Sequence, residues 1–172
     1  MYRVDAYDDP CLQDWARQLG QLLSQRGLRL VTAESCTGGW MAKLLTDIPG
    51  SSAWFDYGVV SYSNTAKQTL LNVPAATLAE HGAVSQATVA AMATGALRHG
   101  AADCAMAVSG IAGPGGGTPD KPVGYVWLAW ALGTQVSTQC YQFPGDRDAV
   151  RRQAVAHAFR GLIQRLRPSS MR

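Results

Sequence analysis

Short apolar segments alternate with segments of helical hydrophobic spacing along almost the whole chain, and this alternation limits the possible folds more than any other feature of the sequence. The apolar segments, which we predict to be strands, cover residues 28–33, 54–62, 103–109, 125–132 and 135–143. Strands that alternate with helices predict an α/β domain in which helices cover a central sheet. The last two predicted strands are joined only by Gly133-Thr134, a hairpin turn that makes the sheet mixed.

The chain is expected to form a single domain over residues 1–172, since this length suits one domain and we find no internal repeat, low-complexity segment or linker. Residues typical of helix ends mark where the predicted helical segments begin and stop. The predicted capping residues are Asp9 followed by Pro10, Gly27, Ser63-Asn64, Ser85 and Asp146.

Charge and cysteine usage exclude several classes of protein. The net charge of +3 is too small to imply a nucleic-acid-binding protein, although residues 147–172 hold seven arginines and one acid, Asp148. That basic final helix is either a solvated face or a surface for phosphate or an acidic partner. The four cysteines lack metal-binding spacing, and the longest apolar stretch, 123–133, is too short to cross a bilayer. We therefore expect a cytoplasmic protein without a metal, nucleic-acid or membrane partner.

Ser35 lies where a predicted strand gives way to a helix, with Gly38 and Gly39 shortly after it. Such a turn exposes a side chain at the carboxyl edge of the sheet and directs the backbone N–H groups of residues 36–39 towards a ligand. These N–H groups can bind a phosphate or stabilise an oxyanion. The alternative is that Ser35 or Thr37 only caps the helix, and the local pattern leaves both open.

A nucleophilic serine needs a base, and the histidines are poorly placed for this role. His81 and His99 lie at expected helix ends, and His157 lies within the basic final helix. Among the lysines at positions 43, 67 and 121, Lys67 follows the second predicted strand by five residues. If the two strands are parallel neighbours, Lys67 reaches the same edge of the sheet as Ser35. Its pKa must then fall by about three units from about 10.4, at a cost of about 4 kcal/mol.

Three further positions are candidates for substrate contacts. Tyr62 ends the second strand and shares this part of the sequence with Lys67, unless it is simply an edge aromatic half-buried in the core. The loop 109–124 holds six glycines and three prolines, which favour a shaped loop that a ligand can approach closely over a merely mobile one. Arg147 opens the final helix and can offer a fixed charge to a phosphate, or form a surface ion pair with Asp146 or Asp148.

Five ordered motifs resemble the CinA C-terminal-domain family over about residues 11–166. They are TAESCTGG (32–39), the stretch Tyr62–Lys67, GAVS (82–85), SGIAGPGGG…KPVG (109–124) and GDRDAVR (145–151). The family includes stand-alone nicotinamide-nucleotide amidases. The resemblance implies a three-layer α/β/α sandwich and an amidohydrolase, an NMN deamidase of pyridine-nucleotide recycling, that converts nicotinamide mononucleotide to nicotinate mononucleotide and ammonia.

The resemblance also implies roles for residues. Ser35 is the expected nucleophile, with Lys67 and Tyr62 as its catalytic partners, and no metal or cofactor is required. The expected substrate-binding residues are Cys36, Thr37, Gly38, Gly39, Ser109, Gly110, Gly113 and Arg147. The protein is expected to be a homo-oligomer. The alternative is a non-catalytic module that binds pyridine nucleotides as a sensor linked to competence or DNA damage.

Overall fold

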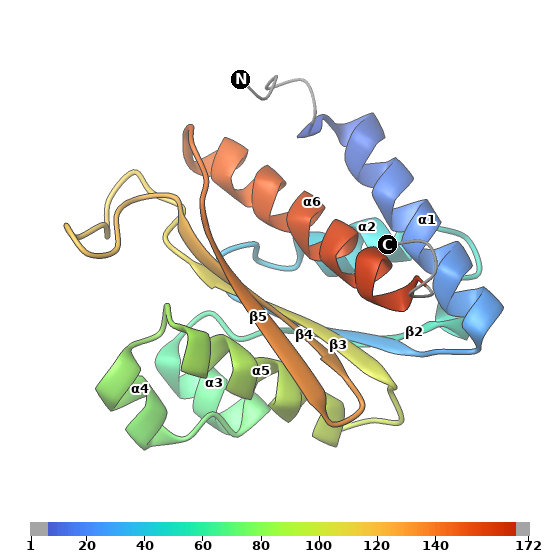
Figure 1. Ribbon diagram of the computed structural model, residues 1–172, viewed down its shortest axis with the longest axis horizontal. Helices are drawn as coiled ribbons and strands as arrows, with labels where there is room; N and C mark the ends of the chain where they lie inside the picture. The colour runs from blue at the N-terminus through green and yellow to red at the C-terminus, as the bar shows by residue number, and fades with distance from the viewer. Residues whose placement is uncertain (1–6, 168–172) are drawn as a thin grey trace.

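The computed structural model describes residues 7–167, and within these residues five strands form one mixed sheet in the order β2-β1-β3-β4-β5 (Figure 1). β1 runs parallel to both β2 and β3, whereas β4 runs antiparallel to β3 and β5. The strands are β1 (Leu30–Glu34), β2 (Phe55–Val60), β3 (Cys104–Gly110), β4 (Tyr125–Leu132) and β5 (Gln135–Gln142). The predicted mixed sheet with a final hairpin is therefore confirmed.

Helices cover both faces of the sheet, which makes the predicted three-layer α/β/α sandwich (Figure 1). α1, α2 and α6 lie on one face, and α3, α4 and α5 lie on the other. Their bounds are α1 (Asp9–Arg26), α2 (Trp40–Thr46), α3 (Asn64–Leu71), α4 (Ala75–His81), α5 (Gln86–Arg98) and α6 (Arg147–Leu166). Over residues 7–167, no helix combines the length and the hydropathy needed to cross a bilayer.

The two faces of the sheet bury side chains of different size. Towards α1 and α6 the strands present large residues such as Met106, Leu128 and Trp130, all fully buried. Towards α5 they present mostly small residues, among them Ala105 and Ala129. Every residue of β1 is buried, including the polar Thr32 and Glu34, because helices cover this strand on both faces. β1 lies between β2 and β3 in the interior of the sheet, and Ser35 directly follows its carboxyl end.

Most of the predicted capping residues lie at the observed helix ends. Ser63, Ser85 and Asp146 each accept a hydrogen bond from a backbone N–H in the first turn of α3, α5 and α6. The predicted cap of the first helix is wrong by one residue, because Asp8 caps α1 and the helix begins at Asp9. The seven-residue α4 was not predicted as an element, since it buries only Leu78 and has no side-chain cap.

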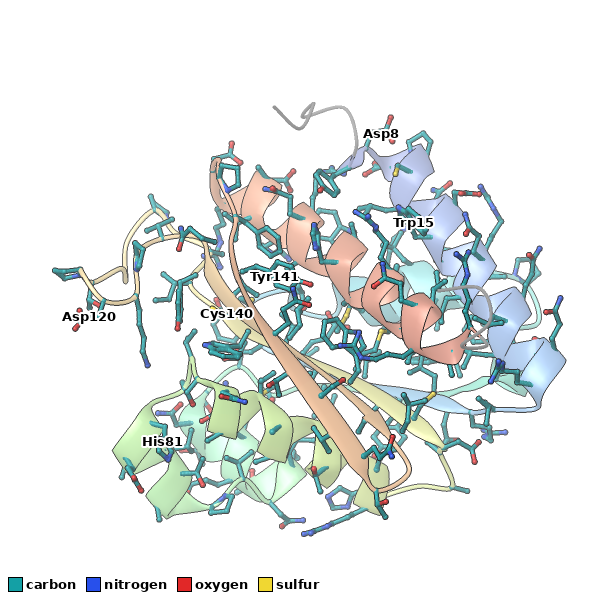
Figure 2. The ribbon with its side chains drawn as sticks, in the orientation of Figure 1. Asp8, Trp15, His81, Asp120, Cys140 and Tyr141 are labelled. Atoms are coloured by element: carbon teal, nitrogen blue, oxygen red, sulfur yellow. The ribbon has the colours of Figure 1, made fainter. Side chains whose placement is uncertain are left out.

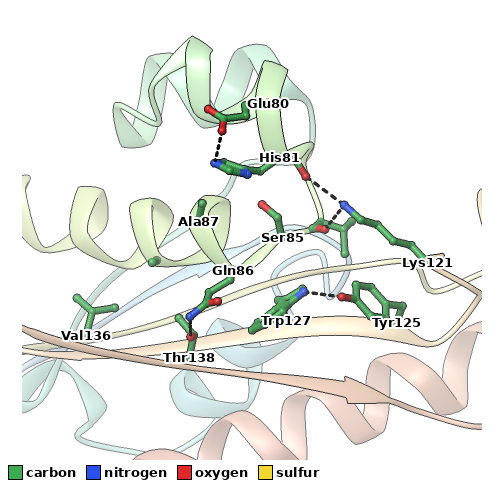
Figure 3. Close-up of a pocket in the computed structure, with 12 residues that line it drawn as sticks. Glu80, His81, Ser85, Gln86, Ala87, Lys121, Tyr125, Trp127, Val136 and Thr138 are labelled. Carbon is green, nitrogen blue, oxygen red and sulfur yellow. Dashed lines mark hydrogen bonds and ion pairs between the residues drawn. The ribbon is translucent and has the colours of Figure 1, made fainter.

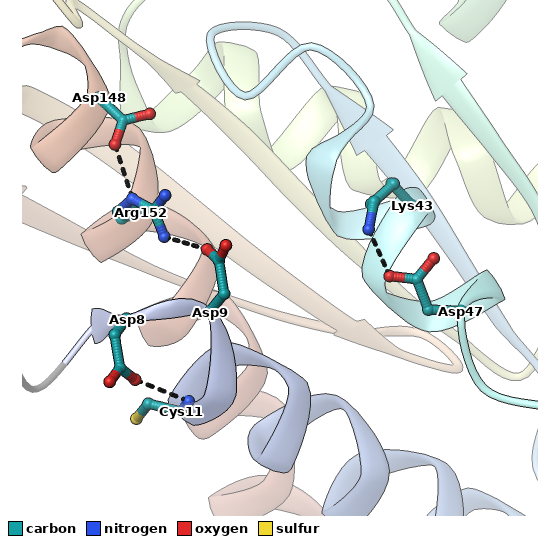
Figure 4. A network of polar contacts seen from close by, with 7 residues as sticks. All are labelled: Asp8, Asp9, Cys11, Lys43, Asp47, Asp148 and Arg152. Carbon is teal, nitrogen blue, oxygen red and sulfur yellow. Dashed lines mark hydrogen bonds and ion pairs between the residues drawn. The ribbon is translucent and has the colours of Figure 1, made fainter.

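The arginines of α6 make contacts within the protein, which corrects the expectation of a solvated basic face. Arg160 lies over the ring of Trp15 of α1, and Arg165 lies over Trp130 of β4. Figure 2 shows Trp15 on the side of α1 that faces α6. Arg152 pairs with Asp9 and Asp148 and links α6 to the start of α1 (Figure 4). α6 also buries apolar residues along its length, including every predicted apolar position from Val150 to Leu166. The helix is therefore a packed layer rather than an exposed tail.

Candidate active site

Ser35 lies in a tight turn between β1 and α2, at the carboxyl edge of the sheet. Its N–H donates to the carbonyl of Val108 on β3, and its side chain is 8% exposed. Gly38 and Gly39 follow with φ angles of 62° and 94°, a left-handed conformation that favours glycine. The two glycines of the motif thus let the chain reverse from strand to helix directly beside the serine hydroxyl.

Glu34, rather than Ser35 or Thr37, binds the start of α2, which answers the capping alternative. Its fully buried carboxylate accepts hydrogen bonds from Thr37 Oγ1 at 2.6 Å and from the N–H groups of Gly39, Met41 and Ala42 at 2.9–3.1 Å. Burial raises the pKa of Glu34, and these hydrogen bonds oppose the rise. The Ser35 hydroxyl therefore has no part in capping. The local sequence pattern does not indicate this role of Glu34.

Lys67 meets Ser35 at this edge of the sheet. Because β1 and β2 are parallel neighbours, α3, which follows β2, carries Lys67 back to the end of β1. Nζ of Lys67 lies 3.0 Å from Oγ of Ser35, and it donates to the carbonyls of Ser61 at 2.8 Å and Tyr62 at 3.3 Å. The side chain is 1% exposed, and no carboxylate of the described residues forms an ion pair with it. Burial accordingly lowers the pKa of Lys67.

Both groups open into a pocket of about 210 Å³. The residues that line it are Ser35, Cys36, Tyr62, Lys67, Ala83, Val84, Ser109, Gly110, Ala112 and Arg147. The structure thus brings together seven of the predicted site residues from four of the five motifs. The other four, Thr37, Gly38, Gly39 and Gly113, do not line the pocket. Gly38 and Gly39 donate their N–H groups to Ser35 O and Glu34 Oε2, so the expectation that these two N–H groups are available to a ligand is wrong.

Arg147 and Tyr62 lie at the exposed mouth of this pocket. Arg147 donates to the hydroxyl of Tyr62 at 3.0 Å and to the carbonyl of Gly113 at 2.8 Å. Gly113 therefore holds Arg147 in place instead of lining the pocket. The alternative of a surface ion pair is wrong, because Asp146 caps α6 and Asp148 pairs with Arg152. Tyr62 is 59% exposed, so it is not the half-buried edge aromatic considered above.

Ala83 and Val84 form part of the pocket wall, although neither was predicted from the sequence to be a site residue. Ser109 Oγ donates to the carbonyl of Ala83 at 2.7 Å. Lys121 Nζ donates to the carbonyls of His81 and Val84 and holds the same turn from the side of a larger neighbouring groove (Figure 3). The GAVS motif was the available signal, but nothing in its local pattern shows that a distant loop would fasten it beside Ser35.

The remaining nucleophilic and basic side chains offer no competing chemistry. Burial raises the pKa of the Cys36 thiol to about 12, so the thiol stays protonated at neutral pH. None of the three histidines lines this pocket. His157 packs against Tyr141 and Phe143, and burial lowers its pKa to about 4. Among residues 7–167, no group of three or more His, Cys, Asp or Glu side chains is placed to hold a metal ion.

A buried serine hydroxyl lies against a lysine amine that forms no ion pair with a described carboxylate, at the edge of an α/β sheet, and this arrangement suits the group of enzymes that use a nucleophile with a base. Comparison with known proteins then defines the group more closely. The chain belongs to the CinA C-terminal domain family, whose model matches residues 12–166.

Named relatives and a solved structure are similar to this chain over most of its length. The chain is 54% identical over 157 residues to the nicotinamide-nucleotide amidohydrolase PncC of Escherichia coli K12, covering 91% of this chain and 95% of that protein. It is 52% identical over 149 residues to the protein of the same name from Pseudomonas putida, covering 87% and 93%. A crystal structure of a competence-damaged protein (CinA) superfamily member from Klebsiella pneumoniae has a TM-score of 0.88 at 45% identity, covering 90% of this chain and 97% of that one.

Proposed function

We propose that this protein is a nicotinamide-nucleotide amidohydrolase that converts nicotinamide mononucleotide to nicotinate mononucleotide and ammonia, with Ser35 as nucleophile and Lys67 as base. The observation that carries the proposal is the 3.0 Å separation of Lys67 Nζ and Ser35 Oγ in a buried pocket. The names of relatives at 52–54% identity supply the substrate. We place this reaction in the recycling of pyridine nucleotides in the cytoplasm. That the protein is a homo-oligomer also stays a prediction.

The surroundings of Lys67 suit an uncharged amine. A neutral amine has two hydrogens and one lone pair, and the carbonyls of Ser61 and Tyr62 accept two hydrogens. The lone pair is then directed at the third neighbour, the hydroxyl of Ser35. Lys67 can therefore take the serine proton as Oγ attacks the carboxamide carbon.

The remaining steps return each group to its starting state. In the tetrahedral intermediate the former carbonyl oxygen is negative, and the N–H groups of Cys36 and Thr37 are its proposed hydrogen-bond donors. The carbon–nitrogen bond breaks as the Lys67 ammonium protonates the leaving nitrogen, which departs as ammonia. Water then attacks the Ser35 ester, with Lys67 taking its proton and returning one to the serine oxygen. Tyr62, whose hydroxyl Arg147 orients, is a second proton donor at the pocket mouth.

The size of the pocket supports an aromatic amide bound with its nucleotide part outside. A volume of about 210 Å³ is below the usual range for drug-sized ligands, so it suits a pyridine ring with its carboxamide. The ribose phosphate would then lie at the mouth, where Arg147 is exposed. Ser109 and Gly110 would line the wall beside the ring.

The test is to incubate the purified protein with nicotinamide mononucleotide and to measure ammonia and nicotinate mononucleotide, with binding followed separately by calorimetry. Equal amounts of both products support the proposal. Tight binding without either product would instead favour the non-catalytic sensor. Neither binding nor turnover would exclude both functions.

Arg147→Met is expected to lower kcat/KM for nicotinamide mononucleotide by about 10- to 100-fold, mainly through KM. The change removes a charge-assisted contact to phosphate, worth about 1.5–3 kcal/mol. Nicotinamide riboside, which lacks the phosphate, is the matched control, and its kcat/KM should differ little between the two proteins. An equal loss with both substrates would contradict phosphate binding and indicate that Arg147 acts through Tyr62 or Gly113.

A further inference from the structure

The backbone N–H groups after Ser35 are almost all engaged by acceptors within the protein. The donors and their acceptors are Gly38 to Ser35 O, Trp40 to Thr37 O, Lys43 to Gly39 O, and Gly39, Met41 and Ala42 to the Glu34 carboxylate. The Thr37 N–H has no acceptor among residues 7–167, and the Cys36 N–H reaches only the sulfur of its own side chain, although both residues are buried. Since buried backbone N–H groups are nearly always paired, these two are candidate donors to a ligand that enters the pocket beside Ser35, where Cys36 forms part of the wall and Thr37 follows it directly.

The carbonyl groups of the same two residues are held by one side chain from the far end of the sequence. Arg151 of α6 donates from Nε to Cys36 O at 3.0 Å and from Nη2 to Thr37 O at 2.9 Å. The planar guanidinium fork is suited to binding two neighbouring acceptors at once. It binds the turn only through its carbonyls, so it does not itself occupy the N–H group of Cys36 or Thr37.

Holding these carbonyls determines the direction of both available N–H groups. In a trans peptide the N–H points opposite to the C=O of the same unit, so the bond to Cys36 O directs the Thr37 N–H away from Arg151. The bond to Thr37 O in the same way orients the Gly38 N–H, which donates to Ser35 O. That carbonyl belongs to the peptide unit of the Cys36 N–H. A cation on the carbonyl oxygen also polarises the peptide and strengthens its N–H as a donor.

We propose that Arg151 is a positioning residue for an oxyanion hole made of the Cys36 and Thr37 N–H groups, an inference that rests on the hydrolysis proposed above. When Ser35 Oγ bonds to the carboxamide carbon, the serine proton passes to Lys67 Nζ. The carbon–oxygen π electrons move to the carboxamide oxygen, which becomes negative and accepts from the two N–H groups. Arg151 touches neither the substrate nor the reacting atoms. It acts by fixing the orientation of the peptide groups whose N–H groups bind the carboxamide oxygen.

The neighbouring Arg152 is a matched control for packing and charge. Arg151 and Arg152 lie 5.1 Å and 5.0 Å from the centroid of the same Trp40 ring. The Arg152 guanidinium, however, binds Asp9 and Asp148 and contacts no backbone group of the serine turn (Figure 4). Replacing either arginine removes one positive charge and one contact with Trp40, but only Arg151 holds the peptides beside Ser35.

The test compares Arg151→Met with Arg152→Met in steady-state hydrolysis of nicotinamide mononucleotide. Arg151→Met is expected to lower kcat by about 100-fold, the effect of losing an oxyanion donor, with KM within about threefold of the wild type. Arg152→Met is expected to keep kcat within about twofold. Equal losses in the two variants, or a change confined to KM, would overturn the proposal. If the wild-type protein releases no ammonia, that result would instead contradict the proposed function itself.

A second measurement separates oxyanion binding from general loss of structure. The aldehyde analogue of nicotinamide mononucleotide adds to Ser35 Oγ and places an oxyanion in the hole, whereas the product nicotinate mononucleotide does not. Arg151→Met should weaken inhibition by the aldehyde about 100-fold and inhibition by the product less than about threefold.

Should Arg151→Met fail to fold, Arg151→Lys, which can still reach a carbonyl, should fold and show an intermediate kcat. Failure of both variants to fold would assign Arg151 to folding and overturn the proposal.

Discussion

Ser35→Ala is expected to reduce kcat for nicotinamide mononucleotide by about 10⁴-fold or more, because the nucleophile that forms the acyl-enzyme is lost. The substitution removes one oxygen from a pocket that distant segments hold in place, and Glu34 still binds the start of α2. The pocket should therefore keep its shape. Calorimetry should show a dissociation constant for nicotinamide mononucleotide within about threefold of the wild-type value.

The covalent intermediate gives an independent measurement of the same role. Rapid acid quenching followed by peptide mass spectrometry should find the nicotinoyl group on the peptide that contains Ser35 in the wild type and none in Ser35→Ala. A variant that keeps more than a tenth of wild-type kcat would show that water attacks the amide directly. Ser35 would then serve only to bind the substrate.

The placement of Ser35 and Lys67 could be predicted because it depends on features that are local in the sequence. A strand followed by two glycines and a helix places Ser35 at a carboxyl edge of the sheet, whatever the rest of the fold. Lys67 follows the neighbouring strand, and parallel pairing of β1 and β2 then brings both side chains to one edge. Helix caps such as Ser85 depend on three or four consecutive residues and are recognisable for the same reason.

The features that were missed depend on contacts between residues far apart in the sequence. Arg151 lies 115 positions beyond the carbonyl of Cys36, and its neighbours along α6 indicate only a basic helix. Lys121 fastens the turn at Val84 from a glycine-rich loop in which its direction could not be deduced. Glu34 directly follows the predicted strand 28–33, and its role as the acceptor for α2 becomes clear only once the turn is folded.

Substitution of Lys67 is expected to lower kcat/KM by about 10³-fold or more, and the choice of substituent tests the role of the neutral amine. Lys67→Met removes the base together with its hydrogen bonds. Lys67→Arg keeps a donor and a positive charge, but a guanidinium cannot give up its proton in the accessible pH range. Both variants should be inactive at every pH from about 6 to about 9. Activity of Lys67→Arg within tenfold of the wild type would show that the residue supplies charge rather than a base.

The pH dependence of the wild type should report the same amine. Only the neutral form of Lys67 can accept the serine proton, so kcat/KM should rise with pH through the lowered pKa and then level off. An activity that falls over this range would contradict the proposed base, because it would require the protonated amine. The Arg152→Met variant, whose guanidinium lies outside the pocket, should show the same profile as the wild type.

Stability should record the protonation state of Lys67 without reference to catalysis. The pKa of Lys67 lies below its ordinary value of 10.5 in the folded state, whereas the unfolded chain recovers that value. Between the two pKa values the unfolded state binds more protons, so the free energy of unfolding of the wild type rises with pH. Lys67→Met lacks this contribution, and its lost hydrogen bonds change stability by an amount that does not depend on pH. The free energy of unfolding of Lys67→Met minus that of the wild type should therefore fall as pH increases from about 7.5 to about 10. A constant difference in urea unfolding over this range would show that Lys67 stays protonated in the fold, and it could not then be the resting base.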